Sequence, residues 1–401
     1  MKKNHLFGAI LLIAGTTLGV GMLAFPTVTS FSGFFPSALL FVLIWLLMLS
    51  SSFFFLDANL SIKGQNNMIT MAEKRLGLWG KIVAWVVYLL LLYSLTAAYI
   101  TGCTPLFIEV VKDWTGYTMP HWLAPFALPL IFGGFVYAGT QGVDRINRIL
   151  MVGLVVSFVL LIFFLPAEVD LSRLSHVDYP ALQIAIPTVI TAFGYHIIIP
   201  SLTTYLNRDR KALRKAILIG SLVPIIVYLF WQVLVLGAVP LQDLAGAFVK
   251  GEASTHPLAR VLQNPFISLA TKFFSFFAII TSFVGVTLSL SDFLTDGFKI
   301  KKTHSGRMLA ILLTFVPPLF FVLSYPDGFY LALNYAGAFV AILLVFLPAA
   351  MVWNLKNYQT PLKRLFLSFV IFIAGAIVFL DIQQERGKLR PLIAKYLKKD
   401  V

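Results

Sequence analysis

The sequence predicts an all-α membrane protein that crosses the bilayer many times. Of its 401 residues, 59% are hydrophobic and 12% are charged, whereas soluble domains contain about 25% charged residues. The mean hydropathy is +0.88. The apolar runs are long enough for membrane-spanning helices and lack the alternation, in units of about ten residues, that is typical of barrel strands.

Eleven apolar segments are predicted to span the membrane. They cover residues 7–30, 34–58, 82–108, 122–139, 147–166, 183–206, 214–239, 266–298, 308–324, 329–354 and 362–381. The first begins with MKKNHLFGAILLIAG, which resembles a secretory signal. No cleavage site of small residues follows it, so we expect this stretch to remain as the first helix.

The basic residues predict a cytoplasmic N-terminus. In that orientation twenty lysines and arginines lie at inner loops and helix ends, and five lie at outer ones, as the positive-inside rule requires. The net charge of +14 is therefore explained by topology, and we expect lipid and no nucleic acid as a partner. If the eleventh segment crosses the membrane, the basic tail, residues 382–401, lies on the outer side. The alternative is that the eleventh segment does not cross the membrane.

Two segments contain helix-breaking residues at matching places. The first contains AGTTLGVGMLAFP (14–26), and the sixth contains TAFGYHIIIPSL (191–202). The two segments are five apart and so run in opposite directions. Interrupted helices in corresponding positions of inverted halves indicate a transporter binding site. Close helix packing by the small residues is the alternative.

Unwound backbone at these two places offers ligands for a zwitterion. Amide N–H groups at half-helix starts attract a carboxylate, and carbonyl groups at half-helix ends attract an ammonium group or a cation. Such irregular backbone is tolerated at membrane depth only where it faces a cavity or protein. We expect the unwinding around Gly19–Gly21 and around Gly194.

A few polar side chains inside the spans could carry chemistry. His196 lies in the second interruption, where three roles are open: contact with substrate or freed backbone, proton transfer, or structure. Thr281 and Ser282 are adjacent hydroxyls that could bind a small cation or bond only to their own helix. Asp57 and Asp292 lie near segment ends, so we interpret them, like Glu109, as solvated or paired carboxylates.

Other classes of protein are disfavoured. The single cysteine, Cys103, excludes an internal disulfide and a cysteine-based metal cluster. The sequence contains no phosphate loop, catalytic triad or HExxH motif, so we expect neither an enzyme nor a bound metal or cofactor. A channel or a non-transporting amino acid sensor is the alternative class, although a repeated filter or charged ring is not visible.

Six stretches resemble the bacterial hydroxy/aromatic amino acid permeases. They are AGTTLGVGMLAFP (14–26), LTAAYITG (95–102), TAFGYHIIIPS (191–201), FWQVLVLG (230–237), TSFVGVTLSLSDFLTD (281–296) and YPDGFYLALNYAG (325–337). The resemblance implies one domain, residues 1–401, with the leucine-transporter-type fold of the APC superfamily. Residues 7–166 and 183–354 would form two inverted repeats of five helices each, and residues 362–381 an extra helix.

The same resemblance implies function and site residues. It implies proton-driven symport of tyrosine across the bacterial inner membrane, with tryptophan or a broader aromatic range as the alternative. The substrate would contact Thr16, Thr17, Gly19, Val20, Gly21, Phe193, Gly194, Tyr195 and His196. The aromatic residues of the central helices add Tyr93 to the candidate substrate residues, and the hydroxyl pair adds Ser282. The coupling ion would involve Gly15, Leu18, Ala278, Thr281, Ser282 and His196. Sodium-coupled relatives of this fold use such a Thr-Ser pair, so sodium is the alternative driving ion.

Overall fold

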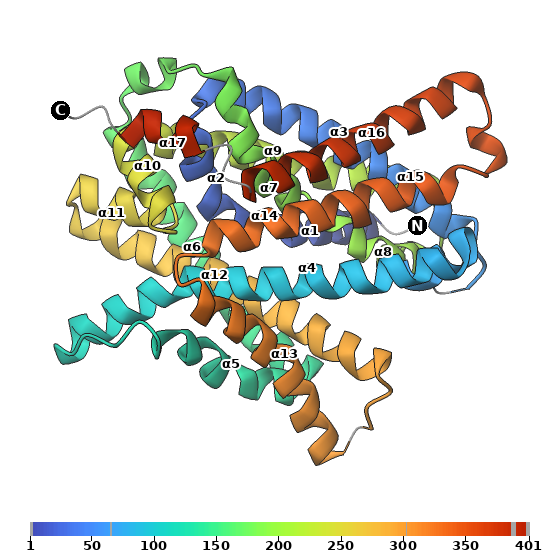
Figure 1. Ribbon diagram of the computed structural model, residues 1–401, viewed down its shortest axis with the longest axis horizontal. Helices are drawn as coiled ribbons and strands as arrows, with labels where there is room; N and C mark the ends of the chain where they lie inside the picture. Colours follow the sequence, from blue (N-terminus) through green and yellow to red (C-terminus); the bar gives the residue numbers. More distant parts are fainter. Residues whose placement is uncertain (1–2, 65, 302, 386–389, 398–401) are drawn as a thin grey trace.

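The computed structural model describes residues 3–64, 66–301, 303–385 and 390–397 (Figure 1). All regular elements in these ranges are helices. Nine of them are long and apolar enough to cross a membrane, or ten if a bent pair near the N-terminus counts as one span. The prediction of an all-helical, multi-span membrane protein is therefore confirmed.

The helices that match the predicted spans follow one another along the chain. They are the pair α1 (Lys3–Thr17) and α2 (Gly21–Ser30), then α3 (Phe34–Leu60), α4 (Met68–Thr115), α6 (Thr140–Phe164), α7 (Leu182–Ala192) with α8 (Ile199–Tyr205), α9 (Arg210–Ala238), α12 (Pro265–Gly297), α13 (His304–Ser324), α14 (Phe329–Val340) with α15 (Leu347–Val352), and α16 (Pro361–Glu385). A π-helical turn, η6 (Ala341–Phe346), joins α14 to α15.

Shorter helices connect these spans. They are η1 (Ala124–Phe126), α5 (Ala127–Tyr137), η2 (Leu165–Glu168), η3 (Leu171–Ser175), η4 (Tyr179–Ala181), η5 (Tyr195–Ile198), α10 (Leu241–Val249), α11 (Thr255–Leu262), η7 (Lys356–Tyr358) and α17 (Arg390–Leu397).

Two predicted segments differ in length from the observed helices. The fourth segment, 122–139, contains only the short apolar helix Ala124–Tyr137, which at 1.5 Å per residue is too short to cross a core of about 30 Å on its own. The third, 82–108, extends into the 48-residue helix α4. Gly77 bends α4 with φ 73° and ψ −160°, a backbone conformation that glycine adopts without steric strain.

The two ends of the bundle carry different elements (Figure 1). The N-terminus lies at the same end as α8 and the turn between α15 and α16, whereas α10, α11 and α17 lie at the other end. Helix α17 packs against α10, and Lys395 forms an ion pair of 2.9 Å with Asp178. Helix α17 thus lies at the end of the bundle opposite the N-terminus. Tail residues 386–389 and 398–401 lie outside the described residues.

Both predicted interruptions are present. Helix α1 ends at Thr17, and α2 begins at Gly21 after a bend of 52°. Helix α7 ends at Ala192, and the chain continues through Phe193 and Gly194 into the 3-10 turn η5. The α1–α2 pair runs away from the N-terminal end of the bundle and α7–α8 runs back toward it (Figure 1), so the two interrupted helices are antiparallel.

Candidate functional site

The first interruption leaves backbone groups free. Three hydrogen bonds bridge it: Leu18 N to Ala14 O at 3.0 Å, Met22 N to Gly19 O at 3.0 Å and Leu23 N to Val20 O at 2.9 Å. Within the described chain, the N–H groups of Gly19 and Val20 have no hydrogen-bond acceptor. These two donors precede α2, whose N-terminus carries the positive end of the helix dipole. The geometry suits an anionic group.

The second interruption is more compact than the first. Its amides are bonded locally, from Phe193 N to Ile190 O, Gly194 N to Thr191 O and Tyr195 N to Phe193 O, at 3.0–3.2 Å. We predicted freed amides around Gly194, and the structure corrects this because the chain tightens into 3-10 turns that satisfy them. The N–H groups of the site that have no hydrogen-bond acceptor among the described residues therefore come from the first interruption.

The two interruptions meet in space. A Cβ atom placed on Gly21 would lie only 2.7 Å from the Cβ of Ala192. Glycine is therefore required where α2 begins, since any side chain would displace the end of α7. The sequence segments that were predicted to form one site from opposite repeats are thus brought into contact.

Helix α9 supports the first interruption from one side. The Tyr228 hydroxyl donates to Thr17 O at 2.5 Å, and Trp231 Nε1 donates to Met22 O at 2.8 Å. Both side chains are completely buried. They lie three residues apart on α9 and so share a face, which places one donor at the end of α1 and the other at the start of α2.

Sequence reasoning did not assign these two α9 residues to the site. The signal that could have identified them is the position of tyrosine and tryptophan within a helical span, because their polar atoms require a partner when buried. The ring of Phe193 lies edge-on to Tyr228 at 5.6 Å, so Tyr228 contacts both interruptions.

His196 is fully buried beside the second interruption. Its ring stacks on Tyr195 at 5.0 Å and meets Phe55 edge-on at 6.3 Å. The Met48 backbone approaches the ring, but neither ring nitrogen forms a hydrogen bond of good geometry with a described residue. A buried polar group without a partner is rare in a finished core and indicates a functional position.

Helix α12 approaches the first interruption at its middle. A Cβ atom on Gly19 would lie 2.9 Å from Ser282 Oγ, and the Tyr99 hydroxyl of α4 also faces Ser282. The Thr281 hydroxyl donates to Phe277 O of its own helix at 2.8 Å. Ser282 is therefore the hydroxyl of the pair that faces the interruption.

The structure separates some of the predicted residues from this place. A Cβ built on Gly15 meets no atom of another described element within 4 Å, so Gly15 is not in close contact with Ala278 or Thr281 of α12. Thr16 and Thr17 lie at the end of α1 beside the first interruption, but their hydroxyls donate to Leu12 O and Ile13 O of the same helix, at 2.7 and 2.8 Å. Tyr93 is directed to α13, where its hydroxyl donates to Leu313 O at 2.9 Å.

Two of the carboxylates interpreted as solvated or paired, Glu109 and Asp57, form ion pairs. Glu109 forms an ion pair with Lys272 at 2.9 Å, and Asp57 contacts Arg210 at 2.8 Å. Both pairs lie near ends of spans, so the charges are compensated outside the middle of the bundle. The centre of the site is therefore formed by peptide groups, hydroxyls, aromatic rings and His196.

Comparison with known proteins identifies the family. The tryptophan/tyrosine permease family matches residues 2–380 of the chain. Tyrosine-specific transport system 2 of Haemophilus influenzae is 34% identical over 333 residues, which cover 81% of this chain and 82% of that protein. The low affinity tryptophan permease of Escherichia coli K12 is 29% identical, with 81% of each chain covered. The tyrosine permease of Enterobacter agglomerans is 26% identical over 96% of this chain and 97% of its own. The chain therefore belongs to the tryptophan/tyrosine permease family, whose members are transport proteins and not enzymes.

Proposed function

We propose that this protein is a symporter that imports tyrosine, and with it other aromatic amino acids, across the bacterial inner membrane. The observation that carries the proposal is the contact between two antiparallel interrupted helices at Gly21 and Ala192, next to the unbonded N–H groups of Gly19 and Val20. We place the N-terminus in the cytoplasm and call that end of the bundle the inner end.

The substrate's charged groups would bind at half-helix ends. Its carboxylate would accept hydrogen bonds from Gly19 and Val20 N–H, where the dipole of α2 adds a favourable field. Its ammonium group would face carbonyl groups at the end of α1 and the hydroxyl of Ser282. The names of the relatives support an aromatic side chain, and Phe193 and Tyr195 offer ring surfaces beside the site.

The proposed transport cycle is alternating access by a leucine-transporter-type 5 + 5 inverted repeat, with α16 as the extra helix. The interrupted helices with α3 and α9 would form a moving bundle that rocks against the remaining helices. Burial supports an inward-facing state: α2 is buried from Met22 to Ser30, whereas Leu11 and Leu12 of α1 are 54% and 53% exposed.

We assign the driving force to protons, with His196 as the coupling residue. A histidine without a bonding partner next to the substrate site can exchange a proton during the cycle. Sodium is the second candidate, because the Ser282 hydroxyl lies close to the first interruption and Thr281 is adjacent to it in α12.

Reconstitution into proteoliposomes tests this proposal. An imposed inward proton gradient without sodium should drive accumulation of labelled tyrosine, and unlabelled tryptophan or phenylalanine should compete while leucine should not. If tyrosine accumulates only when a sodium gradient is imposed, sodium and not the proton is the coupling ion. Tyrosine equilibration unaffected by either gradient would contradict symport.

A further inference from the structure

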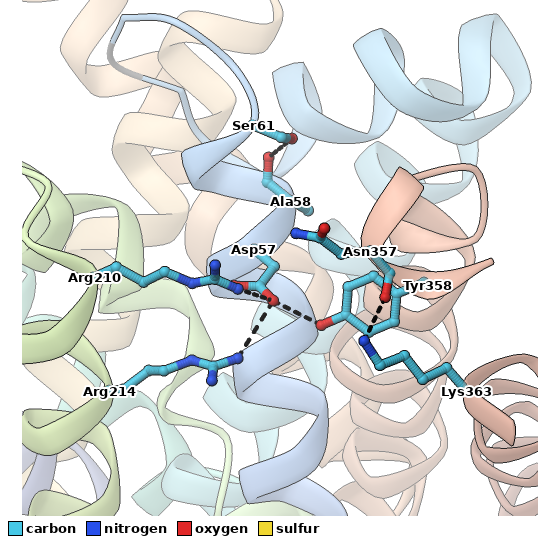
Figure 2. A network of polar contacts seen from close by, with 8 residues as sticks. All are labelled: Asp57, Ala58, Ser61, Arg210, Arg214, Asn357, Tyr358 and Lys363. Atoms are coloured by element: carbon cyan, nitrogen blue, oxygen red, sulfur yellow. Dashed lines mark hydrogen bonds and ion pairs between the residues drawn. The ribbon is translucent and has the colours of Figure 1, made fainter. Parts of the chain in front are cut away.

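A buried carboxylate at the inner end of the bundle joins three separate parts of the chain (Figure 2). The side chain of Asp57, near the end of α3, is only 7% exposed. Arg210 Nη2 donates to both of its oxygens at 2.8 Å, and Arg214 Nη2 lies 3.4 Å from Oδ2. From the opposite side, the Tyr358 hydroxyl donates to Oδ2 at 2.7 Å.

The two arginines attach α9 to α3. They lie one turn apart at the start of α9, and Arg214 also lies over the ring of Phe53 at 5.0 Å. Next to them, Arg208 donates to Leu60 O and Ile62 O at 2.9 Å each. The inner ends of α3 and α9 are thus held together by several contacts and move as one unit.

Tyr358 belongs to a different unit. It lies in η7, the turn between α15 and α16, and its ring meets Phe54 edge-on at 5.6 Å. Lys363 at the start of α16 holds the turn, because its ammonium group donates to Asn357 O at 2.7 Å. The Tyr358 hydroxyl therefore joins the α3–α9 unit to the α15–α16 turn through a hydrogen bond to a charged acceptor, a strong type of contact.

This contact connects elements that the proposed cycle moves apart. Helices α3 and α9 belong to the moving bundle, and the α15–α16 turn belongs to the remainder. In this structure α1, which packs on α9, has no neighbour within 4 Å at Gly15. A tilt of the moving bundle that separated the inner end of α1 from α12 would press α3 toward α15, against which it already packs.

We propose that the Asp57–Tyr358 hydrogen bond is an inner latch that stabilises the inward-facing state. Asp57 and Tyr358 then act as positioning residues, since they do not touch the substrate but set how often the site opens inward. This inference rests on the proposed function. The Asp57–Tyr358 hydrogen bond favours the inward-facing state over the outward-facing state. Loss of the bond therefore shifts the populations of the two states without altering the groups that bind substrate.

The substitution Tyr358→Phe tests the latch, because it removes only the hydroxyl and keeps the ring against Phe54. Spin labels at His5→Cys and Lys299→Cys, in a Cys103→Ser background, report the distance between the inner ends of α1 and α12 by pulsed electron paramagnetic resonance. We expect the ratio of the population with the long distance to the population with the short distance to fall about tenfold. Loss of a hydrogen bond to a charged group predicts a change of this size.

Controls separate the latch from other effects. Tyr117→Phe, at a tyrosine that is 60% exposed on another loop, should leave the distances unchanged. Tyrosine binding to Tyr358→Phe should still be measurable by calorimetry. If Tyr117→Phe leaves the distances unchanged and Tyr358→Phe also keeps the wild-type distances, the latch proposal is wrong. The proposed transport function would not be affected by that result. If the parent protein shows one distance that tyrosine does not alter, alternating access fails and the latch fails with it.

Discussion

Individual residues at the first interruption decide whether the site exists. Gly19 and Val20 supply unbonded N–H groups, and Gly19 also allows α12 to approach until Ser282 Oγ would be 2.9 Å from a Cβ atom. The Ser282 side chain is short and can rotate away from a single methyl group at position 19. A branched side chain at position 19 would not fit between the first interruption and α12. Steric space at one glycine is therefore a direct test of the backbone-lined site.

We expect Gly19→Leu to abolish tyrosine uptake, while Gly19→Ala retains part of it. The leucine side chain would occupy the space between the first interruption and α12, but it leaves every spanning segment apolar, so membrane insertion should be normal. Uptake in proteoliposomes and the yield of monodisperse protein measure the two effects. Gly375→Leu on the exposed face of α16, where no atom lies within 4 Å, is the matched control. Undiminished uptake by Gly19→Leu would show that substrate binds elsewhere.

His196 is expected to matter for transport more than for folding. Neither ring nitrogen forms a hydrogen bond of good geometry with a described residue, so His196→Ala should cost the fold little polar contact. We expect the KM for tyrosine to rise about tenfold, or the pH dependence of uptake to change, because the substitution removes the only histidine that lies beside the second interruption. His121→Ala on an exposed loop provides the control. Wild-type affinity and pH dependence in His196→Ala would make the residue structural.

At the scale of elements, α17 closes the end of the bundle opposite the N-terminus. Its Tyr396 is 6% exposed, and the ring lies 5.6 Å from Phe31 at the end of α2. The Tyr396 hydroxyl donates to Asp178, which precedes η4, and His176 Nε2 lies 2.9 Å from Phe31 O. The C-terminal helix is thus attached to the outer half of the first interrupted helix through residues of the α6–α7 connection.

The charge on Asp178 should control the docking of α17. Hydrogen bonds from Tyr396 and Lys395 hold the pKa of Asp178 below its usual value, although partial burial opposes them. A carboxyl with a lowered pKa stabilises the docked state above about pH 4 and loses that effect as the pH falls through its docked pKa. The protection factors of the amides in residues 390–397, which correct for the slower intrinsic exchange in acid, should therefore fall as the pH drops below about 4.

The variant Asp178→Asn reproduces the protonated state at neutral pH. We expect it to raise amide exchange of α17 at pH 7 and to remove most of the acid dependence. Asp243→Asn on the neighbouring helix α10 is a suitable control, because this aspartate is exposed. Equal protection of α17 in Asp178→Asn and in the unmodified protein would show that apolar packing of Tyr396 alone holds the helix.

At the scale of the whole molecule, substrate binding should stabilise the folded chain. The site is assembled from α1–α2, α7, α9 and α12, so a ligand that binds there favours the folded state over the unfolded one. Tyrosine at 100 times its Kd should add about 2.7 kcal/mol to the free energy of unfolding, seen as a rise of the melting temperature in detergent. Leucine should not reproduce the rise, and Gly19→Leu should remove it. A rise that persists in Gly19→Leu would place the ligand outside the interruptions.

The sequence by itself determined the class of the protein, the course of its spans and the place of both interruptions. Hydropathy is a local property, and helix breakers act on their own turn, so neither depends on distant contacts. The segment around Gly19–Gly21 and the one around Gly194 were found in this way. The exception at element level is the segment 122–139, whose apolar composition did not reveal that only Ala124–Tyr137 is helical.

Only the tertiary structure decided which residues meet at the site. Tyr228 and Trp231 contact the first interruption from α9, more than 200 positions away, and Ser282 rather than Thr281 faces Gly19. The local bonding of the Phe193–Tyr195 amides likewise followed from the packed chain. Such contacts depend on how helices pack and rotate against one another, and packing depends on side-chain shapes from distant segments, which no local pattern in one segment contains.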